Sequence, residues 1–451
     1  GNRVGDLARG YFGDYDLVEF DYDKNKMAHK TNELLQKGSA NIAEAAFYVD
    51  NLYCAVDILH KVGDTYEIIE VKSSTEVKDI YVDDMAFQYY VLNKYGMNVS
   101  DVYIMYLNNT YVHQGELDLK QLFVKECYTD EIKVKQEEVE DNIKSIRAYL
   151  NNRTEPECDI DMYCRKPYKC AYYKYCSRHI PERSIFDVYK MDWKKRYKYY
   201  HEGIITYEDI IENKIKLNAN QQKQVESALY NKPDEIDKDG IREFLNTLSY
   251  PIYHFDFETF QQAVPEYDGI HPYMKIPFQY SLHIEQQDGT LEHKEFLAKE
   301  GTDPRRAIAE SICENIPENV CVLAYNMSFE KSVLTQLAKE FPDLSQHLNA
   351  IADNLHDLAV PFENKYYYSK DMQGLYTIKK VLPALFPEDP ELNYSALEGV
   401  HKGDEASAAF ADLADHNAEE IAVIRENLLK YCGLDTLAMV KILGKLRQCC
   451  E

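Results

Sequence analysis

The stretch Tyr253–Phe260, which reads YHFDFETF, decides the fold of the C-terminal half of the chain. Aromatic and acidic residues alternate in it, as they do in a β-strand whose successive side chains point to opposite faces. We expect Phe255 and Phe257 to fill one face and Asp256 and Glu258 to share the other. Two carboxylates on one face of an apolar strand repel each other and are costly to bury without a cation. The stretch therefore predicts a strand that carries a metal site.

A third acid follows another predicted strand in this half. Residues 321–334 read CVLAYNMSFEKSVL, which predicts a buried strand ending at Asn326 and a helix that Ser328 can cap. Glu330 falls in the first turn of that helix. An acid in this position also compensates the helix dipole, and that explanation would be preferred if Glu330 stood alone.

A predicted helix near the C-terminus carries a fourth acid on its core-facing side. Its stripe consists of Ile421, Ile424, Leu428, Tyr431, Asp435, Ala438, Ile442 and Leu446. Steps of three and four residues place all of them on one helical face. An unpaired carboxylate at Asp435 would destabilise the fold, so we expect a metal ion or a strong partner there. A structural salt bridge is the alternative.

These segments together resemble the DEDD exonucleases of the DnaQ-like fold, in the branch that has a tyrosine before the last acid. The resemblance implies an RNase H-like domain that holds two Mg²⁺ or Mn²⁺ ions and hydrolyses the terminal phosphodiester from the 3′ end. The metal ligands that it implies are Asp256, Glu258, Glu330 and Asp435. Tyr431 would orient the attacking water. The third acid of the family is usually Asp, whereas Glu330 stands here.

A second group of polar residues lies on strands predicted in the N-terminal half. Glu70 and Lys72 are two residues apart, so both project from the same strand face. Antiparallel pairing across a short turn can bring Asp57 beside Glu70, and Gln88 on the helix Val82–Tyr95 can reach the same region. Two carboxylates bind a divalent cation, and the lysine can stabilise charge or orient water. The alternative is a cross-strand Glu–Lys pair on an exposed face.

Four of the eleven cysteines recur at intervals of six residues: Cys158, Cys164, Cys170 and Cys176. This spacing makes no single helical stripe. A disulfide framework would be unusual in a 451-residue chain without a secretory signal. The interval favours loops that fold four thiolates onto one centre, which zinc and a [4Fe–4S] cluster both accept. Four free thiols are the alternative.

The segments CAVDIL, IIEVKSS and AFQYYVL resemble the PD-(D/E)XK nuclease superfamily, in the RecB-like branch that includes CRISPR-associated nucleases with a Cys cluster. The resemblance implies that Asp57 and Glu70 bind metal and that Lys72 and Gln88 complete the site. Members of this branch commonly close the domain with a cysteine cluster, which favours [4Fe–4S] over Zn²⁺ here. In many members one cysteine comes from the start of the domain and a histidine lies on the first helix. Neither is present, since the first cysteine is Cys54 and the first histidine His29.

Composition excludes one class of partner contact. With 51 Lys and Arg against 77 Asp and Glu, the net charge is −26, so the chain does not coat nucleic acid or membrane as a polycation. Residues 158–200 differ, with 11 basic against 5 acidic residues and interleaved tyrosines. Such a segment is typical of a single-strand channel, although a solvated helical face with tyrosines packed beneath it is the alternative. The longest apolar runs, such as Val320–Tyr325, are too short to span a membrane, and no signal-peptide pattern opens the chain, which favours a cytoplasmic protein.

The segments DFET, IPFQYSLH and YCxLDT extend the likeness to an uncharacterised bacterial family that joins a RecB-like domain, a Cys cluster and a DnaQ-like domain. We therefore expect an α/β chain with three parts: a restriction-endonuclease-like domain with a Cys-ligated metal centre at 1–180, a helical connector at 181–247, and an exonuclease domain at 248–451. The expected activity is metal-dependent 3′→5′ exonuclease in the C-terminal domain, with a second DNA-cleaving site in the N-terminal domain.

Two other functions remain open from the sequence. One is a nuclease with a single active site, whose other nuclease-like domain only binds. The other is a non-catalytic nucleic-acid-binding or assembly factor whose acidic surface docks a protein partner. Single-stranded or 3′-ended DNA is the favoured substrate, and RNA is the alternative.

Overall fold

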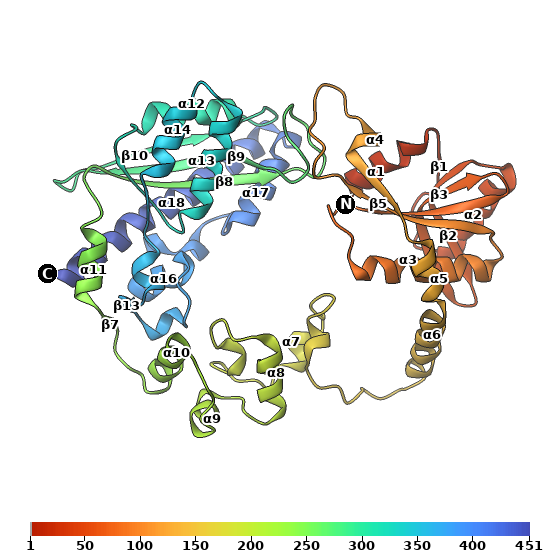
Figure 1. Cartoon of the computed structure of the whole chain (residues 1–451), viewed down its shortest axis with the longest axis horizontal. Coiled ribbons are helices and arrows are strands. Elements are labelled where there is room, and N and C mark those ends of the chain that lie inside the picture. Colours follow the sequence, from red (N-terminus) through yellow and green to blue (C-terminus); the bar gives the residue numbers. More distant parts are fainter. Residues whose placement is uncertain (1) are drawn as a thin grey trace. The chain divides into compact units, whose positions relative to one another are not determined.

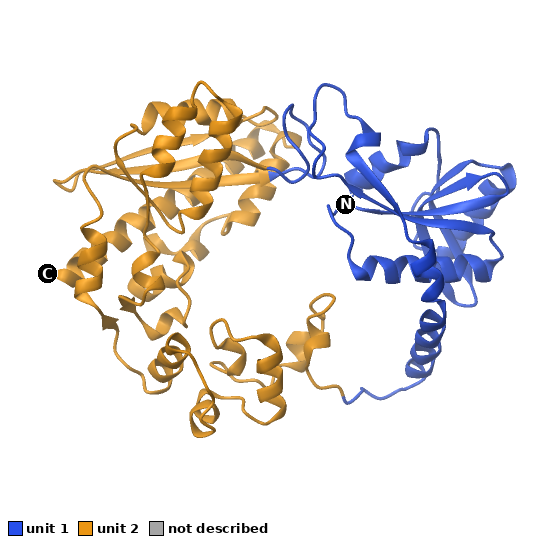
Figure 2. Cartoon of the chain, in the orientation of Figure 1, with its two compact units in different colours: residues 1–157, 261–274 blue, residues 158–260, 275–451 orange. Residues whose placement is uncertain are grey.

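The computed structural model describes residues 2–451 and divides the chain into two compact units (Figure 2). Unit 1 comprises residues 1–157 and 261–274, and unit 2 comprises residues 158–260 and 275–451. Each unit is built from helices and β-sheet, so the expected α/β class is confirmed at this level (Figure 1). Within residues 2–451 no helix is both long and apolar enough to cross a membrane.

Unit 1 contains a six-stranded sheet with the order β1-β2-β3-β4-β5-β6. Its strands are β1 (Asp16–Leu17), β2 (Asn41–Val49), β3 (Leu52–Val62), β4 (Thr65–Lys72), β5 (Val99–Leu107) and β6 (Phe123–Cys127). Its helices are α1 (Asn2–Arg9), α2 (Lys24–Lys37), α3 (Asp79–Tyr95), α4 (Leu119–Leu122), α5 (Thr129–Val134) and α6 (Gln136–Leu150). The strand–turn–strand–helix order predicted around Glu70 is confirmed.

The sheet of unit 1 is covered on both faces. Strands β2, β3 and β4 pair antiparallel, whereas β4 and β5 pair parallel, because α3 makes the crossover between them. Helices α2 and α3 bury one face around Val56, Ile68 and Ile104, and α1 covers the other around Ile58 and Ile69. A strand buried on both faces has few places for charge, which makes the acids of β3 and β4 conspicuous.

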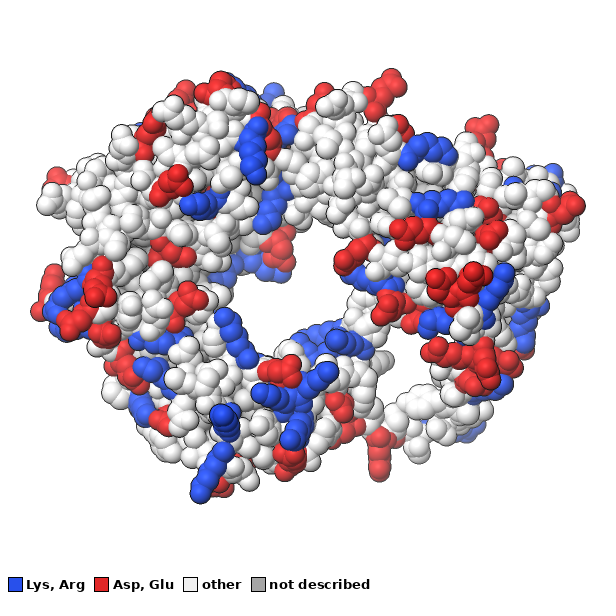
Figure 3. Space-filling model, viewed as in Figure 1, with Lys and Arg blue, Asp and Glu red and all other residues white. Residues whose placement is uncertain are grey.

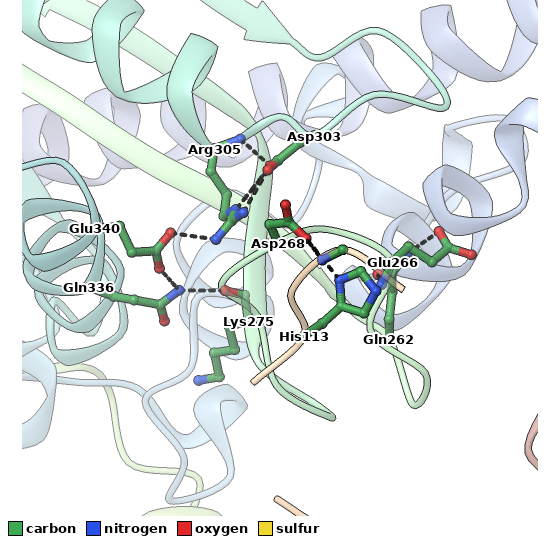
Figure 4. Close-up of polar contacts among 10 residues, drawn as sticks. His113, Gln262, Glu266, Asp268, Lys275, Asp303, Arg305, Gln336 and Glu340 are labelled. Atoms are coloured by element: carbon green, nitrogen blue, oxygen red, sulfur yellow. Dashed lines mark hydrogen bonds and ion pairs between the residues drawn. The ribbon is translucent and has the colours of Figure 1, made fainter. Parts of the chain in front are cut away.

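Residues 261–274 belong to unit 1 although they follow a strand of unit 2. Val264 is 4% exposed and packs in the core that contains Ile58 and Ile69. His113 exchanges two backbone hydrogen bonds with this segment, accepting from Gly269 at 2.8 Å and donating to Ile270 at 2.9 Å. Figure 4 shows the His113 ring facing Asp268, at 3.3 Å.

Unit 2 contains a five-stranded sheet with the order β10-β9-β8-β11-β12. Its strands are β8 (Ile252–Gln261), β9 (Lys275–Glu285), β10 (Leu291–Leu297), β11 (Cys321–Ala324) and β12 (Leu355–Asp357). Strands β9 and β10 pair antiparallel, whereas β11 pairs parallel with both β8 and β12. The stretch quoted first thus forms the middle strand of this sheet. A second, two-stranded sheet pairs β7 (Glu235–Ile236) with β13 (Tyr367–Tyr368).

Helices cover both faces of the five-stranded sheet (Figure 1). The helices after β10 are α12 (Arg305–Asn315), α13 (Ser328–Glu340), α14 (Ser345–Asp353), α15 (Val360–Glu363), α16 (Ile378–Leu385), α17 (Gly403–Ala411) and α18 (Ala418–Cys450). Helices α12, α13 and α14 pack on the face that holds Phe255 and Phe257. Helix α18 lies against the opposite face, where Gln279 of β9 donates to the Leu428 carbonyl at 2.8 Å.

The segment before this sheet also folds with unit 2. Its helices are α7 (Tyr173–Cys176), α8 (Trp193–His201), α9 (Tyr207–Glu212), α10 (Ala219–Leu229) and α11 (Lys238–Leu245). The cysteine-bearing loops were expected to close the N-terminal domain at residue 180, but the structure groups them with unit 2 instead. The reason is packing, because Ile160 and Cys164 are buried against Tyr197 and Tyr200 of α8. Figure 3 shows Lys and Arg side chains gathered over this part of the chain.

Candidate active site

Three acids of unit 2 converge. Asp256 and Glu258 on β8 and Asp435 on α18 each offer a carboxylate oxygen within 4.8 Å of the other two. Strand alternation puts Phe255 and Phe257 in the core and turns both β8 acids to the other face, toward α18. Within residues 2–451, no other three His, Cys, Asp or Glu side chains meet this closely.

Helix α18 positions Asp435 as its apolar stripe predicts. Asn417 caps the helix by accepting from the backbone N–H groups of Glu419 and Glu420, so the register of the stripe is set from its first residue. Leu428, Tyr431 and Asp435 are all buried on one face.

Burial dominates the electrostatics of these acids. It raises the pKa of Glu258 to about 8 and that of Asp435 to about 6. The pKa of Asp256 is raised well above its ordinary value by burial and by the charges of Asp435, Glu330 and Glu258. Negative charges held together away from water are stabilised by cations, and carboxylate oxygens are the ligands that Mg²⁺ and Mn²⁺ prefer. The donor set therefore fits divalent ions.

Glu330 lies in the first turn of α13 but outside the close triad. It is 2% exposed, burial raises its pKa to about 8, and its Oε2 atom has no hydrogen-bond partner. A dipole-compensating surface acid would instead be solvated. The predicted cap is wrong, because Ser328 is itself helical and makes no cap hydrogen bond. Asp357 takes that role by accepting from the N–H groups of Asn326 and Met327, at 2.8 and 3.2 Å.

Two residues that the sequence did not single out complete this site. The Tyr394 hydroxyl donates to Asp435 Oδ1, and the Tyr394 and Tyr431 rings lie 6.1 Å apart. The Lys379 amine lies 5.3 Å from the Tyr394 ring and 5.4 Å from the Tyr431 ring. Its charge lowers the pKa of both Glu258 and Asp435 against the effect of burial. Lys379 is an exposed residue of α16, and Tyr394 is a half-buried residue of the irregular segment that follows α16, so no hydrophobic period marks either of them.

The N-terminal constellation also assembles. Glu70 accepts from Gln88 Nε2 at 2.7 Å and from Lys72 Nζ at 2.5 Å. Asp57 accepts from the Val71 N–H at 2.7 Å. Burial raises the pKa of Asp57 to about 6 and that of Glu70 to about 8, the latter helped by the Asp57 charge. The predicted strand and helix positions thus bring Asp57, Glu70, Lys72 and Gln88 together on one side of unit 1.

Two acids near this constellation were missed. Asp84 of α3 accepts from Lys72 Nζ at 3.0 Å. Glu44 shares a cavity of about 510 Å³ with Asp57 and Lys72 and pairs with Arg9 at 2.9 Å. Its φ of 57° lies in the left-handed region, and the pairing of β2 with β3 omits Glu44 although the register on either side is the same. An acid inside the apolar run IAEAAF is the signal that could have found it.

The four regularly spaced cysteines lie in turns around α7. Cys164 is buried, Cys170 and Cys176 are half-buried, and Cys158 is exposed with its sulfur 3.2 Å from the Tyr163 hydroxyl. Burial raises the pKa of Cys164, and the other three thiols act in the same direction, so Cys164 lies within electrostatic reach of each of them. All eleven cysteines are unpaired, and no three sulfurs in residues 2–451 lie within 4.8 Å of each other. The metal centre stays a prediction.

Comparison with known proteins gives one family. Residues 253–377 match a domain of unknown function, DUF2779. The DUF2779 segment contains β8 and α13, and hence Asp256, Glu258 and Glu330, and it ends before Tyr394 and Asp435.

Two curated relatives are similar over part of the chain. The "Uncharacterized protein MG366 homolog" of Mycoplasma pneumoniae is 31% identical over 211 residues, which cover 42% of this chain and 31% of the relative. The "Uncharacterized protein UU173" of Ureaplasma parvum is 29% identical over 153 residues, which cover 31% of this chain and 22% of the relative. The chain thus spans less than a third of the length of either one. No solved structure matches the chain.

Proposed function

We propose that the chain is a metal-dependent nuclease and that the acidic site of unit 2 hydrolyses nucleic acid from its 3′ end. The observation that carries this proposal is the triad Asp256, Glu258 and Asp435, with oxygens within 4.8 Å and raised pKa values. The order β10-β9-β8-β11-β12, with two acids on its middle strand, supports an RNase H-like, DnaQ-like domain. A buried Tyr431 one turn before Asp435 supports the tyrosine branch of that class.

Each residue of the site has its own role in the proposed reaction. Asp256, Glu258 and Asp435 would hold Mg²⁺ or Mn²⁺, and Glu330, whose Oε2 atom has no hydrogen-bond partner, would join them. Bound there, two divalent ions supply activation of a water and neutralisation of the leaving oxygen. The Tyr431 hydroxyl orients the attacking water, and Lys379 offsets the negative charge that substrate phosphate brings. Single-stranded or 3′-ended DNA is the proposed substrate, and RNA is tested beside it.

The deciding experiment is digestion of single strands labelled at the 5′ end, with Mg²⁺, with Mn²⁺ and with chelator. We expect a ladder that shortens from the 3′ end with either metal, and no digestion in chelator. Asp256→Asn and Asp435→Asn should each abolish digestion and weaken the rise in melting temperature that metal produces, because each removes a negative ligand. Tyr431→Phe should slow digestion while keeping the metal response. Asp412→Asn, at an exposed acid of the same unit, is the control.

Two outcomes would count against this function. If Asp256→Asn keeps both digestion and metal response at the wild-type level, the triad is not a metal site. If the wild-type protein binds single strands without cleaving them in any metal, a non-catalytic binding or assembly factor, docked to a protein through its acidic surface, takes its place.

A second cleaving site is proposed in unit 1, supported by the geometry of Asp57, Glu70, Lys72 and Gln88. This arrangement supports a PD-(D/E)XK nuclease in which the two acids hold one divalent ion and the lysine stabilises charge. Lys72→Ala, made in a protein that already carries Asp256→Asn, should remove the remaining cleavage of DNA. Lys37→Ala, at an exposed lysine of α2, is the matched control. Undiminished cleavage by the Lys72→Ala protein would leave unit 1 as a domain that only binds.

The cysteine-bearing loops are proposed to hold a metal centre. Four thiolates around one zinc ion lie roughly 3.8 Å apart, as a Zn–S distance near 2.3 Å in a tetrahedron requires. No three sulfurs in residues 2–451 come within 4.8 Å of each other. The preference for a [4Fe–4S] cluster, with Zn²⁺ as the alternative, rests on the resemblance to RecB-like nucleases that close the domain with a cysteine cluster. Eleven unpaired cysteines support a reducing compartment, and we place the protein in the cytoplasm on that ground.

A further inference from the structure

A cavity of about 580 Å³ lies between α16 and the irregular segment that follows it. Apolar side chains form much of its wall: Pro383, Phe386, Pro387, Pro390, Leu392 and Tyr394. Its volume is within the range that small-molecule sites occupy in proteins. Among the residues that line it, only those at one edge also contact the acidic site.

That edge is shared with the acidic triad. Lys379 and Tyr394 both line the cavity. Tyr394 also donates its hydroxyl hydrogen to Asp435, and the charge of Lys379 acts on Glu258 and Asp435. The Lys379 amine donates to the carbonyl of His401, which also lines the cavity, at 3.1 Å. The cavity and the triad are therefore neighbours with a common wall of one cation and one aromatic ring.

The charges on the wall set the orientation of any ligand. Glu388 and Asp389 also line the cavity and would repel a phosphate placed beside them. Asp389 Oδ1 and Asn393 Oδ1 already accept from the backbone N–H groups of Glu391 and Ser395. The Glu388 carboxylate and the second oxygen of Asp389 are acceptors that suit the amino and imino groups of a nucleobase. Apolar and aromatic side chains offer stacking surface for its flat ring. A neutral nucleoside thus suits the interior, with its phosphate at Lys379.

We infer that this cavity holds the 3′-terminal nucleoside of the substrate, with its 5′-phosphate placed between Lys379 and the triad. The inference rests on the proposed function, whose site it extends. It makes Tyr394 a residue with two contacts, to the nucleoside on one side and to Asp435 on the other. Lys379 binds the 5′-phosphate of that nucleoside.

The test measures equilibrium binding, which does not depend on hydrolysis. Deoxyadenosine 5′-monophosphate and 2-deoxyribose 5-phosphate, which lacks the base, are titrated calorimetrically into the full chain with Mg²⁺. The base should strengthen binding by roughly fivefold or more, the low end of what base stacking contributes. Ser395→Trp fills the cavity from an exposed wall position and should reduce this preference to less than about twofold. Gln346→Trp, exposed on α14 and outside the cavity, should leave it unchanged.

Melting temperatures establish that the variants fold. If Ser395→Trp does not, Pro387→Trp tests the same wall from a second exposed position. The inference is overturned if the wild-type protein binds the two ligands equally or binds neither, or if the filled cavity keeps the full preference for the base.

Digestion of strands with a normal or an abasic 3′-terminal nucleotide separates this inference from the proposed function. Metal-dependent digestion with the same KM for both strands would support the proposed function and contradict a role for the cavity in substrate binding. Base-dependent binding of the monophosphate without any digestion would support the cavity as a nucleoside site and contradict the proposed exonuclease function. A KM that rises for the abasic strand in the wild-type protein, and not in Ser395→Trp, supports both.

Discussion

Glu258, Glu330 and Glu70 are each less than 10% exposed, and burial raises the pKa of each to about 8. In an unfolded chain the same groups titrate near pH 4.5. Between these two values the folded state binds more protons than the unfolded state. The free energy of unfolding must therefore fall as pH rises through this window.

We predict that the melting temperature of the metal-free protein falls between pH 5 and pH 8. Glu258→Gln removes one such group and should lessen this fall by about 5 °C or more. Excess Mg²⁺ should also lessen it in the wild-type protein, because bound cations replace the protons. Circular dichroism melts in chelator at four pH values measure the slope. Glu292→Gln, at an exposed acid on β10, is the control, and an unchanged slope in Glu258→Gln would contradict the prediction.

The site residues that could be predicted from the sequence lie in segments with a regular hydrophobic period. Asp256 and Glu258 alternate with two phenylalanines, and Asp435 interrupts an apolar stripe, so a single period reveals each of them. Tyr394 has no such frame, and its contact with Asp435 joins positions 41 residues apart through an irregular segment. Glu44 has a left-handed backbone conformation that no alternation predicts.

Single elements show the same division. Strand β8 and helix α18 are confirmed because each has an uninterrupted period, whereas the start of α13 is set by a carboxylate from β12 rather than by its own Ser328. The cysteine-bearing loops have no period of their own. Their assignment to unit 2 depends on tyrosines of α8, which the sequence offered only as part of a basic and aromatic segment.

This packing gives a prediction for Cys170. Cys170→Ser should raise amide hydrogen exchange in α8 and lower the metal content of the purified protein, because Cys170 packs in the cluster that holds Tyr197 and Tyr200. Cys449→Ser, at a half-buried cysteine of the same unit, should change neither. Exchange mass spectrometry and metal analysis of anaerobically purified protein measure both effects. Absence of both iron and zinc from the wild-type protein would contradict the metal centre. Unchanged hydrogen exchange in α8 of the Cys170→Ser protein would contradict a structural role for Cys170.

For the molecule as a whole, the boundaries at 180 and 248 that the sequence suggested treat each domain as one continuous piece. The structure instead returns residues 261–274 to unit 1. Nothing in the segment QQAVPEYDGIHPYM has a helical or strand period, and its assignment rests on contacts with residues about 150 positions earlier, such as Gly115 with Asp268. Pattern analysis has no access to such contacts.

The returned segment predicts how the chain behaves when it is cut. Residues 151–158 are exposed, and trypsin should cleave there after Arg153. The two fragments should still elute together in size-exclusion chromatography, because Val264 stays in the core of unit 1. Val264→Asp should release the N-terminal fragment after cleavage, and Val423→Asp, at an exposed position of α18, should not. Separation of the wild-type fragments would contradict the prediction.

The same segment fixes an order of events during synthesis. A ribosome delivers residues 1–157 first, but the last piece of their core emerges only after residues 158–260 have followed. Until then the cluster around Ile58 and Ile69, which α1 covers, lacks Val264, while β8 is already available for pairing. Vectorial folding of one domain after another is the usual path for long chains. Here the nascent N-terminal unit reaches its final state only when the strand that carries Asp256 and Glu258 has been made.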